Sequence, residues 1–141
     1  MTREPGPEFL VDTSVAVALS TLDHEGRASA LTVVSGRRIG LAGHAAFETY
    51  SVLTRLPGSA RRTPAAVARI ISANFPHTRF LGAAAAAELL GSMTGKGVAG
   101  GAVYDAMVAA TAVEHRVPLV TRDLRALGTY RALEAEVVVV R

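Results

Sequence analysis

The stretch FLVDTSVAVAL, residues 9–19, places a single carboxylate, Asp12, inside an apolar run. Residues 9–12 favour a short strand, and the segment that follows can begin a helix capped by Thr13 or Ser14. An unpaired carboxylate is costly in apolar surroundings, so Asp12 must cap a helix, pair with a cation or belong to a site. Capping alone is a fair explanation for an aspartate at a strand-to-helix turn. The other acidic residues decide between these readings.

Short apolar runs alternate with helical patterns along the rest of the chain. The strand-like segments after the first are 39–42, 78–82, 117–121 and 137–140. The strongest helical segments are 44–56, 83–93 and 102–116, and Thr63-Pro64 opens a further helix. This alternation predicts an α/β fold with a mostly parallel sheet of about five strands. We expect a flexible leader over residues 1–8 and a single domain over residues 9–141.

The composition narrows the classes of function. Without any cysteine, the chain has neither disulfides nor thiolate metal sites. No apolar run approaches the roughly 20 residues of a membrane span, so we expect a cytoplasmic protein with no membrane partner. Of 15 basic residues all but Lys96 are arginines, and the net charge is +3. Arginine pairs bidentately with phosphate or carboxylate, so such a surface suits nucleic acid or an acidic partner.

Three more acidic residues lie in or beside apolar segments. Asp123 follows the strand-like segment 117–121, and in a parallel sheet it would share the carboxyl edge with Asp12. Asp105 and Glu48 lie on helical segments. Each has a structural alternative: an arginine ion pair for Asp105, a half-exposed surface position for Glu48, and the start of a helical turn for Asp123.

A cluster of these carboxylates would need compensation. Two like charges about 4 Å apart repel by about 4 kcal/mol at an effective dielectric constant near 20. Protonation, arginine pairing or a metal ion would relieve that repulsion. Oxygen-only ligands select a hard cation such as Mg²⁺ or Mn²⁺.

Four segments in this order, VDTSV, FETYSVLTRL, GGAVYDAMVAATA and LVTRDLRAL, resemble PIN-domain proteins, in particular VapC-type toxins of bacterial toxin–antitoxin pairs. The resemblance runs from about Phe9 to the end of the chain. It implies a three-layer α/β fold and an endoribonuclease that depends on Mg²⁺ or Mn²⁺. Relatives often carry an aromatic residue shortly after the last aspartate, where this chain has Leu127.

The resemblance also implies roles for particular residues. Asp12 and Asp105 would hold the metal directly, while Glu48 and Asp123 would act through water or recruit a second ion. The hydroxyl after the first acid falls on Thr13 or Ser14, and the one before the last acid falls on Thr121. Near Asp123, the side chains that could steer RNA phosphates are Arg122 and Arg125.

The partners implied by the resemblance are an RNA substrate, a cognate antitoxin and a second copy of the chain in a homodimer. One alternative is a catalytically silent PIN-like module that binds RNA or protein. Another is a different Mg²⁺-dependent phosphoryl-transfer enzyme. A haloacid-dehalogenase-like phosphatase would need an aspartate where Ser14 stands and a catalytic lysine, for which Lys96 is the sole candidate.

Overall fold

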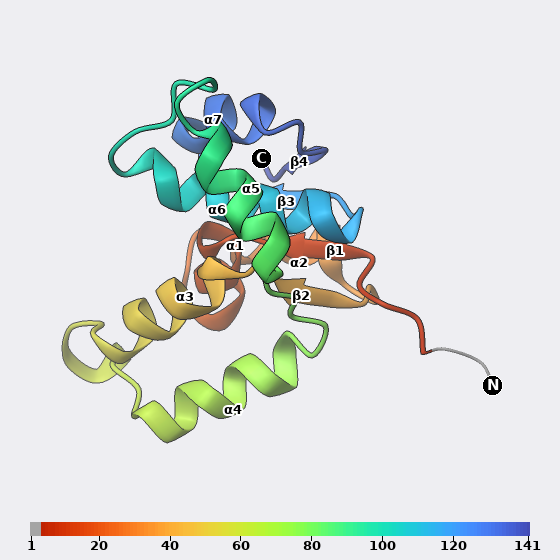
Figure 1. Cartoon of the computed structure of the whole chain (residues 1–141). Helices are drawn as coiled ribbons and strands as arrows, with labels where there is room; N and C mark the ends of the chain where they lie inside the picture. The colour runs from red at the N-terminus through yellow and green to blue at the C-terminus, as the bar shows by residue number, and fades with distance from the viewer. Residues whose placement is uncertain (1–3) are drawn as a thin grey trace.

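A parallel β-sheet forms the centre of the protein. The computed structural model describes residues 4–141 (Figure 1). Its strands pair in the order β2-β1-β3-β4, and every pairing is parallel. The strands are β1 (Phe9–Val11), β2 (Ile39–Leu41), β3 (Leu119–Thr121) and β4 (Val137–Val139). The predicted parallel sheet is confirmed, with four strands in place of about five.

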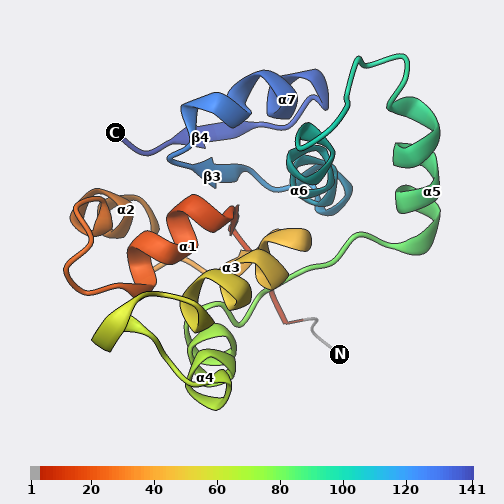
Figure 2. The same cartoon turned by 90° about the vertical axis from the view of Figure 1, so that its left-hand side faces the viewer.

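Helices cover both faces of this sheet, so the predicted three-layer arrangement is confirmed. Figure 2 shows α7 on one side of the strands and α1 with α2 on the other. Two short 3₁₀ turns, Gly58–Ala60 and Leu124–Ala126, complete the elements. The α-helices are α1 (Thr13–Ser20), α2 (Arg27–Val34), α3 (His44–Thr54), α4 (Pro64–Asn74), α5 (Ala83–Ser92), α6 (Ala102–His115) and α7 (Leu127–Ala132).

The strand residues alternate between two apolar cores. Leu10 and Leu119 pack with residues of α5, α6 and α7. Val11 and Val120 face the opposite side and pack with residues of α1 and α2. Successive side chains of a strand point to opposite faces, so a sheet buried on both faces needs continuous apolar runs. This requirement explains why the strands lack polar alternation.

The predicted strand over 78–82 is reduced to one isolated parallel bridge between Ala42 and Arg79. The preceding segment lies so close to β2 that a Cβ on Gly40 would stand 2.0 Å from the backbone carbon of His77. Backbone hydrogen bonds run from the N–H of His77 to the carbonyl of Ile39 and from the N–H of Arg79 to the carbonyl of Leu41, both at 3.2 Å. The N–H of Leu41 binds the Thr78 hydroxyl at 3.0 Å. This side-chain bond interrupts the backbone ladder, and one bridge remains.

None of the helices in the described part of the chain is long and apolar enough to cross a membrane.

Helix α4 begins as predicted: Thr63 Oγ1 accepts the backbone N–H of Ala66 at 3.2 Å, and Pro64 is the first helical residue.

We expect Gly40→Ala to lower the free energy of unfolding by about 1–3 kcal/mol or more, because its Cβ would overlap backbone atoms that have no rotamer to adopt. Denaturant unfolding checks this. Gly91→Ala in α5 is the matched control, since nothing lies within 4 Å of its Cβ, and it should be neutral or stabilise by up to about 1 kcal/mol. Equal stability of the two variants would contradict the close approach at Gly40.

Candidate metal-binding site

The strand order places two acidic residues at one edge of the sheet. Asp12 directly follows β1, and Asp123 lies two residues beyond the end of β3. The chain leaves β1 for β2 on one side and reaches β3 on the other, so the ends of β1 and β3 form a topological switch point. Ligands of open parallel sheets bind at such points. Asp12 and Asp123 therefore lie at the same carboxyl edge of the sheet, as predicted.

Asp12 is buried, with 3% of its surface exposed, and four donors bind its carboxylate. Oδ1 accepts the Ser14 hydroxyl at 2.6 Å and the Val15 backbone N–H at 3.2 Å. Oδ2 accepts the hydroxyls of Thr121 and, at 2.8 Å, Tyr130. Burial raises the pKa of Asp12, and the four donors oppose that rise by stabilising the ionised form.

Asp12 also caps helix α1, through the bond from Val15. The prediction that Thr13 or Ser14 would take the capping role is therefore wrong. The extended backbone of Asp12 turns its carboxylate back over the first helical turn, as in an ordinary N-cap. The sequence analysis treated helix capping and membership of a polar site as alternatives for Asp12, but its carboxylate has both roles.

The two hydroxyls beside Asp12 are themselves oriented by backbone groups. Ser14 Oγ accepts the N–H of Arg122 at 2.9 Å, and Thr121 Oγ1 accepts the N–H of Asp123 at 3.0 Å. Each hydroxyl thus accepts from the chain after β3 and donates to Asp12. Ser14, rather than Thr13, is the hydroxyl after the first acid that reaches it.

Tyr130 is the residue of this network that the sequence reasoning did not identify. It is buried in α7, with 2% of its surface exposed. The spacing of Ala126, Tyr130 and Leu133 places all three on one buried helix face, and a buried phenol needs a hydrogen-bond partner. That spacing was the signal in the sequence from which Tyr130 could have been identified.

Asp105 lies in the first turn of α6, where the helix dipole favours a negative charge. Burial raises the pKa of its carboxyl, and the nearby carboxylates of Asp123, Glu48 and Asp12 raise it further, while Arg125 lowers it. No arginine or lysine of residues 4–141 forms an ion pair with Asp105. The ion-pair alternative for Asp105 is therefore wrong. The charges of the other three acids therefore all act on Asp105.

Glu48 and Asp123 make local contacts of their own. Glu48 Oε1 lies 3.4 Å from His44 Nε2, one turn earlier on α3. Asp123 Oδ1 accepts the backbone N–H of Arg125 at 3.0 Å, which caps the following 3₁₀ turn, and lies 3.5 Å from Arg125 Nε. The structural alternatives for both residues thus describe their placement: Glu48 is half-exposed, and Asp123 starts a helical turn.

The residue types fit a hard divalent cation, because every acidic donor in the region is a carboxylate oxygen. Their side-chain positions do not form a closed ligand set: across residues 4–141 no three histidine, aspartate or glutamate side chains are placed to hold a metal ion. Both oxygens of Asp12 are fully engaged by donors, and Glu48 and Asp123 are turned toward His44 and Arg125. A bound ion would require some of these contacts to exchange.

The two predicted phosphate-steering arginines differ in placement. The Arg125 side chain is 95% exposed. The Arg122 guanidinium lies against Gly26, where an added Cβ would stand 2.2 Å from Cζ. Arg125 is therefore the more accessible of the two.

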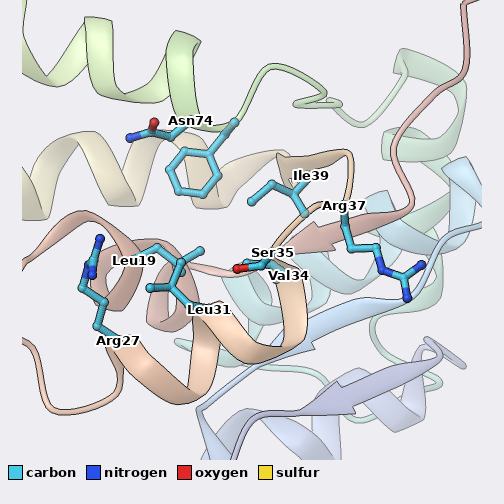
Figure 3. A pocket seen from close by; sticks show the side chains of 9 residues that line it. Leu19, Arg27, Leu31, Val34, Ser35, Arg37, Ile39 and Asn74 are labelled. Atoms are coloured by element: carbon cyan, nitrogen blue, oxygen red, sulfur yellow. The ribbon is translucent and has the colours of Figure 1, made fainter.

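A cavity of about 280 Å³ lies elsewhere, between α1, α2, the start of β2 and the end of α4 (Figure 3). Its walls include Leu19, Leu31 and Phe75, and its polar lining comes from residues such as Arg27 and Asn74. No carboxylate lines it, so it is separate from the acidic edge.

A family model described as PIN domain matches residues 9–131. Ribonuclease VapC27 of Mycobacterium tuberculosis is 42% identical over 133 residues, which are 94% of this chain and 97% of that protein. Ribonuclease VapC40 of the same species is 45% identical over 130 residues, 89% and 94% of the two chains.

Two solved structures share the fold at 20% sequence identity. One is FitAcB from Neisseria gonorrhoeae, with a TM-score of 0.66 over 92% of this chain and 95% of that one. The other is FitAB bound to the IR36 DNA fragment, with a TM-score of 0.67 over 92% and 93%.

Tyr130→Phe should lower the free energy of unfolding at neutral pH by about 1.5–3 kcal/mol, because the buried Asp12 carboxylate loses a donor. Chemical denaturation measures the change. Tyr50→Phe, at an exposed position of α3, serves as control and should change stability by less than about 0.5 kcal/mol. A Tyr130→Phe protein as stable as the wild type would mean that the phenol contributes nothing to holding Asp12.

Asp105→Asn should stabilise the metal-free protein at neutral pH by about 0.2–1 kcal/mol, a modest gain because solvent screens this partly exposed group. A raised folded-state pKa stabilises the fold below the ordinary carboxyl value of 3.8, and that stabilisation is lost as pH rises through the folded-state pKa. The wild type should therefore lose stability as pH increases from about 4, whereas the variant loses less. Melting in EDTA across that range tests this, and parallel curves would contradict it.

Proposed function

The chain belongs to the PIN-domain family, and from that premise we propose that it is a divalent-metal-dependent endoribonuclease and the toxin of a toxin–antitoxin pair. The observation that carries the proposal is the placement of Asp12 and Asp123 after the neighbouring strands β1 and β3 at the switch point of a PIN-family sheet. Burial raises the pKa of Asp105, and the charges of Asp123, Glu48 and Asp12 raise it further, which is consistent with a cluster of acids near this edge. The relatives named ribonucleases share 42–45% identity over most of the chain, which supports the same activity here.

We assign Asp12 and Asp105 as direct ligands of Mg²⁺ or Mn²⁺. Glu48 and Asp123 then act through water or hold a second ion. The donor chemistry supports this set, because all four residues offer carboxylate oxygens and, across residues 4–141, neither Asp12 nor Asp105 forms an ion pair with an arginine or lysine.

The bound ion would supply positive charge at the scissile phosphate and a water of lowered pKa. The protein's own residues hold Asp12 in place: Ser14 and Thr121 fix the orientation of its carboxylate, and the Tyr130 hydroxyl from α7 donates a further hydrogen bond to it. Hydrolysis needs no nucleophile from the protein and leaves a 3′-hydroxyl and a 5′-phosphate. Arg125, exposed beside Asp123, is placed to contact a neighbouring phosphate.

The proposal includes partners. We assign an RNA substrate, a cognate antitoxin protein that neutralises the enzyme, and a homodimeric state, with action in the cytoplasm. The phosphatase alternative is disfavoured, since the Ser14 hydroxyl is committed to Asp12.

Purified protein with Mn²⁺ or Mg²⁺ should cleave RNA to products with 5′-phosphate ends, and Asp105→Asn should reduce the rate by about 100-fold or more. Denaturing gels and sequencing of the 5′-phosphate ends provide the measurement. Asp105 is preferable to Asp12 for this test. Replacing Asp12 by alanine would leave the Thr121 and Tyr130 hydroxyls without their acceptor and confound lost activity with lost stability.

Metal binding is the companion measurement. Mn²⁺ should raise the melting temperature of the wild type more than that of Asp105→Asn. A protein that binds RNA without cutting it under any divalent metal would be the catalytically silent module. Equal metal-induced shifts in both proteins would place the ion elsewhere.

A further inference from the structure

The α3–α4 hairpin carries positive charge and no acidic side chain beyond the first turns of α3. Residues 49–87 contain five arginines and neither aspartate nor glutamate, although the chain has 12 acidic residues in all. Helices α3 and α4 pack against each other, and the turn that joins them lies away from the sheet (Figure 1). Three of the arginines, Arg55, Arg61 and Arg62, belong to this turn. We call these three residues the arginine turn.

Hydrogen bonds hold the arginine turn against the end of α3. The backbone N–H of Arg62 donates to the carbonyl of Leu53 at 3.3 Å. The Nε of Arg61 donates to the carbonyl of Leu56 at 3.0 Å. The backbone N–H of Arg55 closes the last turn of the helix. The three guanidinium groups therefore start from one fixed piece of backbone, which reduces the entropy that is lost when they bind a common ligand.

The cations of the arginine turn lack partners of opposite charge. Across residues 4–141, none of the three forms an ion pair with a carboxylate. The Nη1 atom of Arg62 is buried, and within the described chain it has no hydrogen-bond partner. Such a donor is unfavourable, because burial removes it from water and nothing replaces the lost hydrogen bond. An acceptor that binds the guanidinium of Arg62 would relieve this penalty.

A groove of about 440 Å³ lies beside the arginine turn. Arg61 and Arg62 line it together with Thr54 and Thr63, and no carboxylate of the described chain is part of the lining. The planar fork of a guanidinium group pairs with two oxygens of a phosphate at once. The groove therefore suits a phosphate group.

Helix α3 joins the arginine turn to the acidic edge. Glu48 and Arg55 are seven residues apart, about two helical turns, so both lie on the same face of α3. A rise of 1.5 Å per residue separates them by about 10 Å along the helix axis. Ser51, between them on this face, is exposed. A strand of RNA at the acidic edge can thus reach the turn within about three nucleotides, at about 3.4 Å of axis per phosphate.

The surface of the turn favours a phosphate backbone over a protein partner. Protein partners bind mainly through apolar and aromatic anchors at the centre of the interface. Within residues 51–79 no large apolar side chain is exposed. A phosphate backbone needs cations and hydrogen-bond donors, which the turn supplies. Cations near the acidic edge also offset the repulsion between its carboxylates and the phosphates of a nucleic acid.

We propose that the arginine turn is a second binding site for the RNA substrate, which holds backbone phosphates away from the cleaved bond. This inference rests on the proposed ribonuclease function and adds the part of the substrate that lies beyond the scissile phosphate. The RNA then runs along α3 from the acidic edge to the turn. The turn adds affinity without any preference for particular bases, because phosphates are the same in every sequence.

The test measures the binding of a fluorescein-labelled oligoadenylate of about 20 nucleotides by anisotropy over a series of salt concentrations, with Ca²⁺ as the divalent ion. Arg62→Gln and Arg55→Gln should each weaken binding by about 3- to 10-fold and reduce the slope of log affinity against log salt by about 0.7. Arg131→Gln removes the same charge from an exposed position of α7 and should change binding less than about two-fold.

Cleavage kinetics provide a second measurement. Because the turn lies away from the cleaved bond, Arg62→Gln should raise KM for RNA by about 3- to 10-fold and leave kcat within about two-fold. A fall in kcat at unchanged KM would contradict the proposed placement. Melting temperatures verify that the variants fold, and Arg55→Gln, at an exposed position, carries the test if Arg62→Gln does not fold.

Three outcomes would overturn the inference. One is equal RNA binding by Arg62→Gln, Arg55→Gln and Arg131→Gln. Another is a loss of affinity without a change in the salt slope, because the loss of a phosphate contact must reduce the release of counterions. The third is a labelled oligoglutamate that binds as tightly as RNA and responds equally to the variants, which would make the turn a docking site for an acidic peptide.

The two proposals fail separately. RNA binding and cleavage that are indifferent to Arg55→Gln and Arg62→Gln would reject the arginine turn and leave the ribonuclease function standing. Turn-dependent RNA binding by a protein that cuts no RNA would do the reverse.

Discussion

The rest of the structure depends on the hydrogen bonds that the buried Asp12 carboxylate accepts. This acid collects donors from the start of α1, the end of β3 and the middle of α7, and it ends β1. Without those donors, burial of an ionised group would be too costly to sustain. The acid therefore organises the edge at which it lies, because the groups that donate to it belong to α1, β3 and α7 and are held together there.

The carboxylates at this edge repel one another in the metal-free protein. Asp105 shows the effect most directly, since burial raises the pKa of its carboxyl, three acids raise it further and one arginine lowers it. Repulsion between like charges lowers the stability of the fold, and acidic clusters of this kind are typical of functional sites. The cation site proposed above depends on this accumulated charge.

Much of this could be predicted from the sequence, because a strand that is buried on both faces and ends in an aspartate is a strong local pattern. The shared edge of Asp12 and Asp123 followed from parallel pairing alone. The cap assigned to Thr13 or Ser14 was wrong, since residue propensity does not fix which oxygen turns over the helix. The irregular segment at 78–82 depends on the close approach at Gly40, which leaves no trace in hydrophobic periodicity.

The separation along the chain of the groups that bind Asp12 has a consequence for synthesis. Thr121 and Tyr130 lie 109 and 118 residues from Asp12. Such non-local contacts form late, after the ends of a long loop have been brought together. During translation the N-terminal carboxylate leaves the ribosome long before its partners. A nascent chain therefore has no assembled centre until almost all of it has emerged, and the ribosomal RNA beside it stays out of reach of a finished nuclease.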